Sequence, residues 1–233
     1  SYRGLPPHKF MPMPGVHKQR HRTLKAPLLL SSFTEELAEM SGNHVAISGD
    51  FSRIFEPSDY MAMVNTSDQA ACVLRGHLVL EEFLHLWIDK VTSTDDMFRG
   101  VFVPFKSKLQ ISKNLGLSQD HFEVLDKINT IRNKFGHRKG YEVELSTLDS
   151  LAEKIDGISE PEKTLPSREF VAYISGKDQN GNRVDKEFNY PDSDGRMKFI
   201  ILFVVYMLKL SWWLQSEFNN RNIEYTIIEG LPS

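Results

Sequence analysis

A run of 16 residues, Phe199 to Leu214, limits the possible folds more than any other part of the chain, because nearly every side chain in it is apolar. A bilayer crossing needs about 20 such residues, and this run is interrupted by Lys209 and Ser211. A helix that is apolar on all sides has to be buried. We therefore predict that this segment is the central helix of a bundle and not a membrane span.

Capping and turn signals divide the chain before this helix into shorter helical segments. S-x-x-E at Ser32 to Glu35 and T-x-x-Q at Thr66 to Gln69 are typical of capping boxes. Glycines close most of the predicted segments, and the apolar positions within them follow a helical period. Amphipathic helices bury their apolar stripes against one another, so a helical bundle is expected. The predicted helices cover residues 32–42, 66–90, 104–116, 118–137 and 145–157.

Two β-like runs precede the central helix. Arg168 to Ser175 and Arg183 to Tyr190 flank Asn180-Gly181, a dipeptide typical of hairpin turns. The fold class predicted is thus mainly α, a helical bundle with an inserted β-hairpin at about residues 168–190. We expect one domain over residues 32–233, preceded by an extended, proline-rich basic arm over residues 1–31.

The arm is a candidate nucleic-acid contact. Residues 1–27 contain six basic residues and no acidic residue. Clustered basic charge is the sequence-independent signature of nucleic-acid binding, which makes Lys18, Arg20 and Arg22 candidate phosphate contacts. A basic tail that is merely solvated is the alternative.

The cysteine content and the start of the chain bear on the compartment. The single Cys72 excludes an intrachain disulfide and fits a reducing cytosol. It opens an apolar helix, so we interpret it as a packing residue and not as a nucleophile. The basic arm is not followed by the apolar segment of a signal peptide. A cytoplasmic protein is expected.

The stretch Asp126 to His137, which reads DKINTIRNKFGH, separates into two faces when it is placed on a helix. One face is apolar and is expected to join the core. The opposite face is polar and is expected to be exposed to solvent. Gly136 is expected to end the helix. The apolar face comprises Val124, Ile128, Ile131 and Phe135, and the polar row comprises Asp126, Asn129, Asn133 and His137.

Residues 132–137, which read RNKFGH, resemble the R-N-x-x-x-H form of the Rx4-6H motif of HEPN domains. Within that superfamily they are most similar to the mannitol operon repressor-like branch, whose helix ends in R-N-x-F-A-H; Gly136 replaces the alanine. The segment RGHLVLEEFLHLWI at residues 75–88 also resembles the first long helix of that branch. The resemblance covers about residues 68–137 and, more weakly, the helix near Phe199.

The resemblance implies a four- or five-helix bundle that forms a homodimer, with the motif helices of two subunits building one RNA-cleaving cleft. It implies RNA as the substrate and a toxin or phage-defence context with a cognate antitoxin or regulatory protein. His137 would accept the 2′-hydroxyl proton, Arg132 would stabilise phosphate charge, and Asn133 would orient either group. Lys134, Arg138 and Lys139 would attract RNA. No cofactor or metal is expected.

Two alternatives stay open beside the ribonuclease that we favour: a regulatory module, and a nucleotide- or ligand-binding bundle. The second has less support, because the chain contains no Gly-rich phosphate loop. Members of the repressor-like branch are regarded as regulators, which implies a non-catalytic regulatory or interaction module. In that case Arg132 would pair with Glu81 or Glu82 and the motif would serve packing. The row His77, Glu81 and His85 has a spacing that suits a metal on one helix face, but edge polar residues are the interpretation that we prefer.

Overall fold

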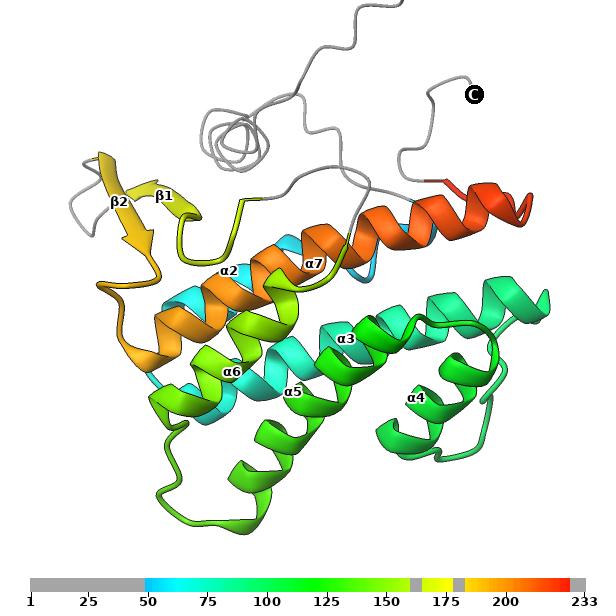
Figure 1. Ribbon diagram of the computed structural model, residues 1–233, viewed down its shortest axis with the longest axis horizontal. Helices are drawn as coiled ribbons and strands as arrows, with labels where there is room; N and C mark the ends of the chain where they lie inside the picture. Colours follow the sequence, from blue (N-terminus) through cyan, green and yellow to red (C-terminus); the bar gives the residue numbers. More distant parts are fainter. Residues whose placement is uncertain (1–48, 160–164, 178–182, 227–233) are drawn as a thin grey trace, which may run out of the picture.

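The structure is a computed structural model, and it describes residues 49–159, 165–177 and 183–226. These residues form a mainly α fold with an inserted antiparallel hairpin, which confirms the predicted fold class (Figure 1). The arm and the helix predicted at 32–42 lie outside the described residues. The elements are η1 (Gly49–Phe51), α2 (Pro57–Asn65), α3 (Gln69–Thr92), α4 (Phe105–Asn114), α5 (Gln119–His137), α6 (Leu145–Asp156), β1 (Val171–Lys177), β2 (Arg183–Asn189) and α7 (Gly195–Asn220).

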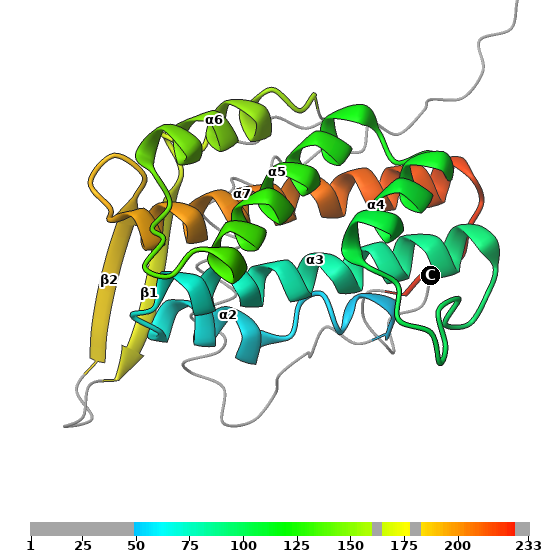
Figure 2. The same ribbon diagram turned by 90° about the horizontal axis from the view of Figure 1, so that it is seen from below.

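Helix α7 is the long apolar helix, and it runs the length of the bundle beside α3 (Figures 1 and 2). Among the described residues it alone is long and apolar enough to cross a membrane, a criterion of length and composition only. Most of its apolar stretch is buried inside the bundle, as predicted for a central helix. Lys209 is buried as well, and its ammonium donates to the carbonyl of Ile158 at 2.9 Å.

Helix α3 begins later than its capping box predicts. The cap is Asp68, whose Oδ1 accepts from the backbone N–H of Ala70 at 2.9 Å, whereas Thr66 Oγ1 accepts from the N–H of Asp68. An aspartate beside the first helical turn caps better than a threonine two residues earlier. The short helix α2 was not predicted, although Pro57 at its start is a typical first-turn residue.

Helix α5 carries the motif and begins as predicted. Ser118 caps it by accepting from the backbone N–H of His121 at 3.3 Å. The prediction that Gly136 ends the helix is wrong, because α5 continues through Gly136 to His137. The left-handed conformation that glycine favours occurs instead at Gly140, where φ is +70° and the chain turns toward α6.

The hairpin pairs β1 with β2 in antiparallel register, with Val171 opposite Asn189 and Lys177 opposite Arg183. Its predicted turn, Asn180-Gly181, lies outside the described residues. After α7, residues 223–226 form no strand.

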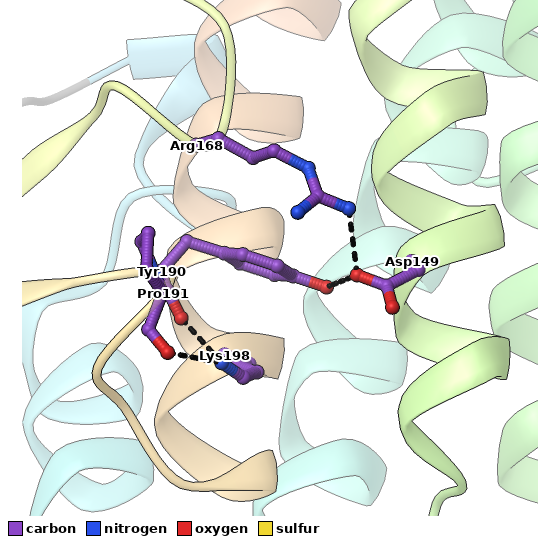
Figure 3. A network of polar contacts seen from close by, with 5 residues as sticks. All are labelled: Asp149, Arg168, Tyr190, Pro191 and Lys198. Carbon is purple, nitrogen blue, oxygen red and sulfur yellow. Dashed lines mark hydrogen bonds and ion pairs between the residues drawn. The ribbon is translucent and has the colours of Figure 1, made fainter.

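A polar network fixes both ends of the hairpin to the bundle (Figure 3). On α6, Asp149 Oδ1 accepts from the hydroxyl of Tyr190 at 3.1 Å and from Arg168 Nη2 at 2.9 Å. On α7, Lys198 Nζ donates to the carbonyls of Tyr190 and Pro191. Burial raises the pKa of the Tyr190 hydroxyl, so it remains a donor. These contacts give the hairpin a structural role in the bundle.

Candidate functional site at the end of helix α5

The motif occupies the last two turns of α5, at the edge of the bundle where α5 diverges from α4 (Figure 1). The predicted apolar face is confirmed, since Val124, Ile128 and Ile131 are buried. Phe135 is half-buried and its ring packs edge-on against Tyr141, with centroids 4.9 Å apart. These contacts fix the helix so that its last polar residues stand at the surface.

Arg132, Asn133 and His137 form the outer part of the site. Arg132 Nη1 donates to Asn133 Oδ1 at 3.1 Å, and both side chains are half-buried. His137 is the last residue of α5 and is exposed. Asn133 lies one turn before His137 on the same face of the helix. The hydrogen bond to Asn133 therefore orients the guanidinium of Arg132 toward the face of α5 on which His137 lies.

Arg132 has no acidic partner among the described residues. The two glutamates predicted as alternative partners are engaged elsewhere: Glu81 pairs with Lys108 at 2.6 Å, and Glu82 pairs with Arg53 at 3.6 Å. The guanidinium carries five N–H donors, and its bond to Asn133 uses one of them. The structure therefore does not support the alternative in which Arg132 pairs with Glu81 or Glu82.

The prediction that the polar row faces solvent is wrong for Asn129, which is buried between helices. Asn129 is only 8% exposed, and its Oδ1 accepts from His77 Nε2 of α3 at 3.2 Å. Asp126 forms an ion pair with Lys106 of α4. Both side chains are used between helices, because α3 and α4 pack against this part of α5. Only Asn133 and His137 of the row stand outside those contacts.

His77 is a buried histidine behind the motif. It is 4% exposed, and its ring lies 4.2 Å from that of Phe105, centroid to centroid. Burial lowers the pKa of His77, the hydrogen bond with Asn129 opposes that shift, and the nearby positive charge of Arg132 adds to it. His77 is therefore neutral, and its Nε2 carries the proton that it donates to Asn129 Oδ1. From the sequence, Asn129 was assigned only to the polar row and His77 only to a possible metal row, so their pairing behind the motif was missed. The signal available was that Asn129 lies one turn before Asn133.

The row His77, Glu81 and His85 on α3 does not converge on one point. His77 bonds Asn129, Glu81 pairs with Lys108, and the ring of His85 packs against Phe98 at 5.7 Å. In the part of the chain that the structure describes, no three His, Cys, Asp or Glu side chains are grouped as metal ligands.

Basic side chains surround the end of α5. Arg138 and Lys139 are exposed, and the ammonium of Lys134 lies 5.5 Å from the ring centre of Tyr141. The carboxyl end of a helix carries partial negative charge, which favours cations there for purely structural reasons. Lys18, Arg20 and Arg22 of the arm lie outside the described residues.

Cys72 is buried at the start of α3. Burial raises the pKa of its thiol to about 12. A thiol in this state is a poor nucleophile, which agrees with its interpretation as a packing residue.

Comparison of the chain with protein-family models, with curated proteins and with solved structures gave no match.

Proposed function

We propose that this protein is a metal-independent endoribonuclease of the HEPN type. The observation that carries the proposal is the relation of Arg132, Asn133 and His137. A guanidinium without an acidic partner among the described residues is held by Asn133, one turn before an exposed histidine. Metal-free phosphodiester cleavage uses a cation that stabilises phosphate charge and an imidazole that transfers protons.

The chemistry assigned to the site is attack of an RNA 2′-hydroxyl on the adjacent phosphorus. The imidazole of one His137 accepts the hydroxyl proton as the new P–O bond forms. The 5′-oxygen leaves and takes a proton from a second, protonated His137. Arg132 stabilises the charge that develops on the phosphate oxygens. The products are a 2′,3′-cyclic phosphate and a 5′-hydroxyl.

A homodimer is part of the proposal. Residues five apart on a helix are separated by about 140° around its axis, so one α5 does not place Arg132 and His137 side by side. Two α5 helices related by a two-fold axis bring the arginine of one subunit toward the histidine of the other. The resemblance to HEPN domains implies the same arrangement.

The proposed context is a cytoplasmic toxin or phage-defence protein that a cognate antitoxin or regulatory protein restrains. An enzyme that cuts cellular RNA without a cofactor needs such control.

The test is cleavage of labelled single-stranded RNA by the purified chain, with the products examined for cyclic phosphate ends. Loss of a general base typically lowers a rate by about 10²- to 10⁴-fold, so His137→Ala and Arg132→Ala should both lose detectable cleavage. Asn133→Ala should lose activity only in part. EDTA should change little. Arg99→Ala is the control, because it removes an exposed arginine that is not part of the site and should retain most of the activity.

Equal cleavage by the wild type and by His137→Ala would assign the activity to a contaminant or to another site. RNA binding that depends on Arg132, without cleavage by any variant, would instead favour the regulatory module.

A further inference from the structure

Asn129 lies directly behind the outer part of the site. A helix turns by about 100° per residue, so around the α5 axis Asn129 falls between Arg132 and Asn133 and one turn before them. The side chain of Arg132 reaches across that interval, because its Nη1 donates to Asn133 Oδ1. Asn129 therefore lies one turn before Arg132 and Asn133, on the same side of α5.

The two asparagines present the same chemistry. Asn129 Oδ1 accepts from His77 Nε2, and Asn133 Oδ1 accepts from Arg132 Nη1. The oxygen of each amide is thus engaged, which leaves the Nδ2 donors. Neither Nδ2 donates to a described residue. Asn129 is 8% exposed and Asn133 is half-buried. Two amides and one guanidinium together form a cluster of hydrogen-bond donors, which suits an anion.

We propose that Asn129 is a further phosphate-binding residue of the site, and that His77 is the positioning residue that turns its amide so that Nδ2 faces the substrate. This inference rests on the proposed function and specifies how the scissile phosphate is held. The phosphate oxygens receive N–H groups from Arg132, Asn133 and Asn129. His77 itself does not contact RNA.

The decisive variant is Asn129→Asp. The new side chain has the same shape and still accepts from His77 Nε2, but it replaces the Nδ2 donors by a carboxylate oxygen. In a purely structural role, the buried carboxylate would lower the stability of the fold. In a phosphate-binding role, it would in addition weaken RNA binding under conditions in which the variant is still folded. Removal of a hydrogen bond to a charged group corresponds to about 10- to 100-fold in affinity.

Binding is measured with a labelled single-stranded RNA in the His137→Ala background, so that cleavage does not enter. We expect Asn129→Asp to weaken binding by about 10- to 100-fold. Asn114→Asp is the matched control, because Asn114 is exposed on α4 and its Oδ1 also accepts a side-chain amide, from Gln110 at 3.2 Å. Asn114→Asp changes the net charge by the same amount as Asn129→Asp, and it should bind RNA with the affinity of the parent.

The role of His77 is tested with two further variants. His77→Gln retains a side-chain N–H donor for Asn129 Oδ1 and should bind RNA within a few-fold of the parent. His77→Leu removes the donor, frees the amide to rotate and should weaken binding clearly. Denaturant unfolding of each variant shows whether it is folded under the binding conditions.

Parental affinity in Asn129→Asp, or equal affinity in His77→Gln and His77→Leu, would overturn the inference while leaving the proposed function intact. A parent that does not bind RNA would overturn both. If RNA binding depends on Asn129 but the wild-type protein does not cleave RNA, the inference about Asn129 holds and the proposed nuclease activity is wrong.

Discussion

Lys108 on α4 and Glu81 on α3 form an ion pair with 2.6 Å between Nζ and Oε1. The side chain of Lys108 is only 8% exposed, whereas that of Glu81 is 25% exposed. The ammonium also lies 5.5 Å from the ring centre of Phe98. A charge in this position has little access to water, so the pair ties α4 to α3 close to the motif helix.

The two partners should respond differently to mutation. Glu81→Ala leaves a buried ammonium without its counter-ion, and breaking a buried pair in this way costs about 3–5 kcal/mol. Lys108→Met should cost less, because the carboxylate of Glu81 reaches water and the methionine fills the apolar space. Urea unfolding of both variants and of the double variant Glu81→Ala/Lys108→Met checks this order. The double variant should be more stable than Glu81→Ala alone.

Stability should depend on pH through His77. Its pKa is lowered in the folded protein, chiefly by burial, so below its ordinary value of about 6.5 the unfolded chain binds a proton that the folded chain resists. The stabilisation is present above about pH 6.5 and is lost as the pH falls toward the lowered value. The slope is at most about 1.4 kcal/mol per pH unit.

The measurement is the free energy of unfolding between about pH 7.5 and about pH 5.5 for the wild type and for His77→Gln, a range set around the ordinary pKa of histidine. The difference between the two proteins isolates His77 from the other histidines. The polar groups that face the ring of His77 are those of Asn129, Arg132 and Glu81. Lys108 lies beyond Glu81, with which it pairs. Parallel pH profiles for the two proteins would contradict the prediction.

The proposed dimer through α5 can be tested at Gly136. This residue is exposed, and a Cβ added to it would meet no atom within 4 Å in the single chain. Gly136→Lys should therefore fold normally, yet add a positive charge to a dimer face where the cations of both subunits, Arg132 among them, already meet. Sedimentation should show a dimer for the wild type and a monomer for Gly136→Lys.

Gly136→Ala is the matched control for that experiment, because it adds a small group that also favours the helix, and it should remain a dimer. A wild-type monomer at micromolar concentrations would refute the dimer prediction.

The salt dependence of RNA binding should separate the arm from the end of α5. Deletion of residues 1–27 removes six basic residues, and each phosphate that the protein no longer neutralises lowers the slope of log K against log salt by about 0.7. The slope should therefore fall by up to about 4. Replacement of Lys134, Arg138 and Lys139 by alanine should lower it by up to about 2. An unchanged slope after the deletion would make the arm a solvated tail.

Local signals in the sequence were sufficient to predict most of the helices and their apolar faces. The composition of Phe199 to Leu214 predicted a buried helix, and the helical period placed Ile128 and Ile131 in the core. Both signals depend only on which side chains lie on one face of one helix. Ser118 could likewise be recognised as a cap, because a cap needs only the next few residues.

The burial of polar residues, in contrast, depended on how the helices pack. Asp126, Asn129, Asn133 and His137 look alike along the sequence, yet α3 and α4 engage the first two and leave the last two outside their contacts. The pairing of Glu81 with Lys108, which leaves Arg132 without an acid among the described residues, likewise depends on the packing of three helices. Periodicity assigns a residue to a face of its own helix, whereas the partner that covers that face is set by packing between elements distant in sequence.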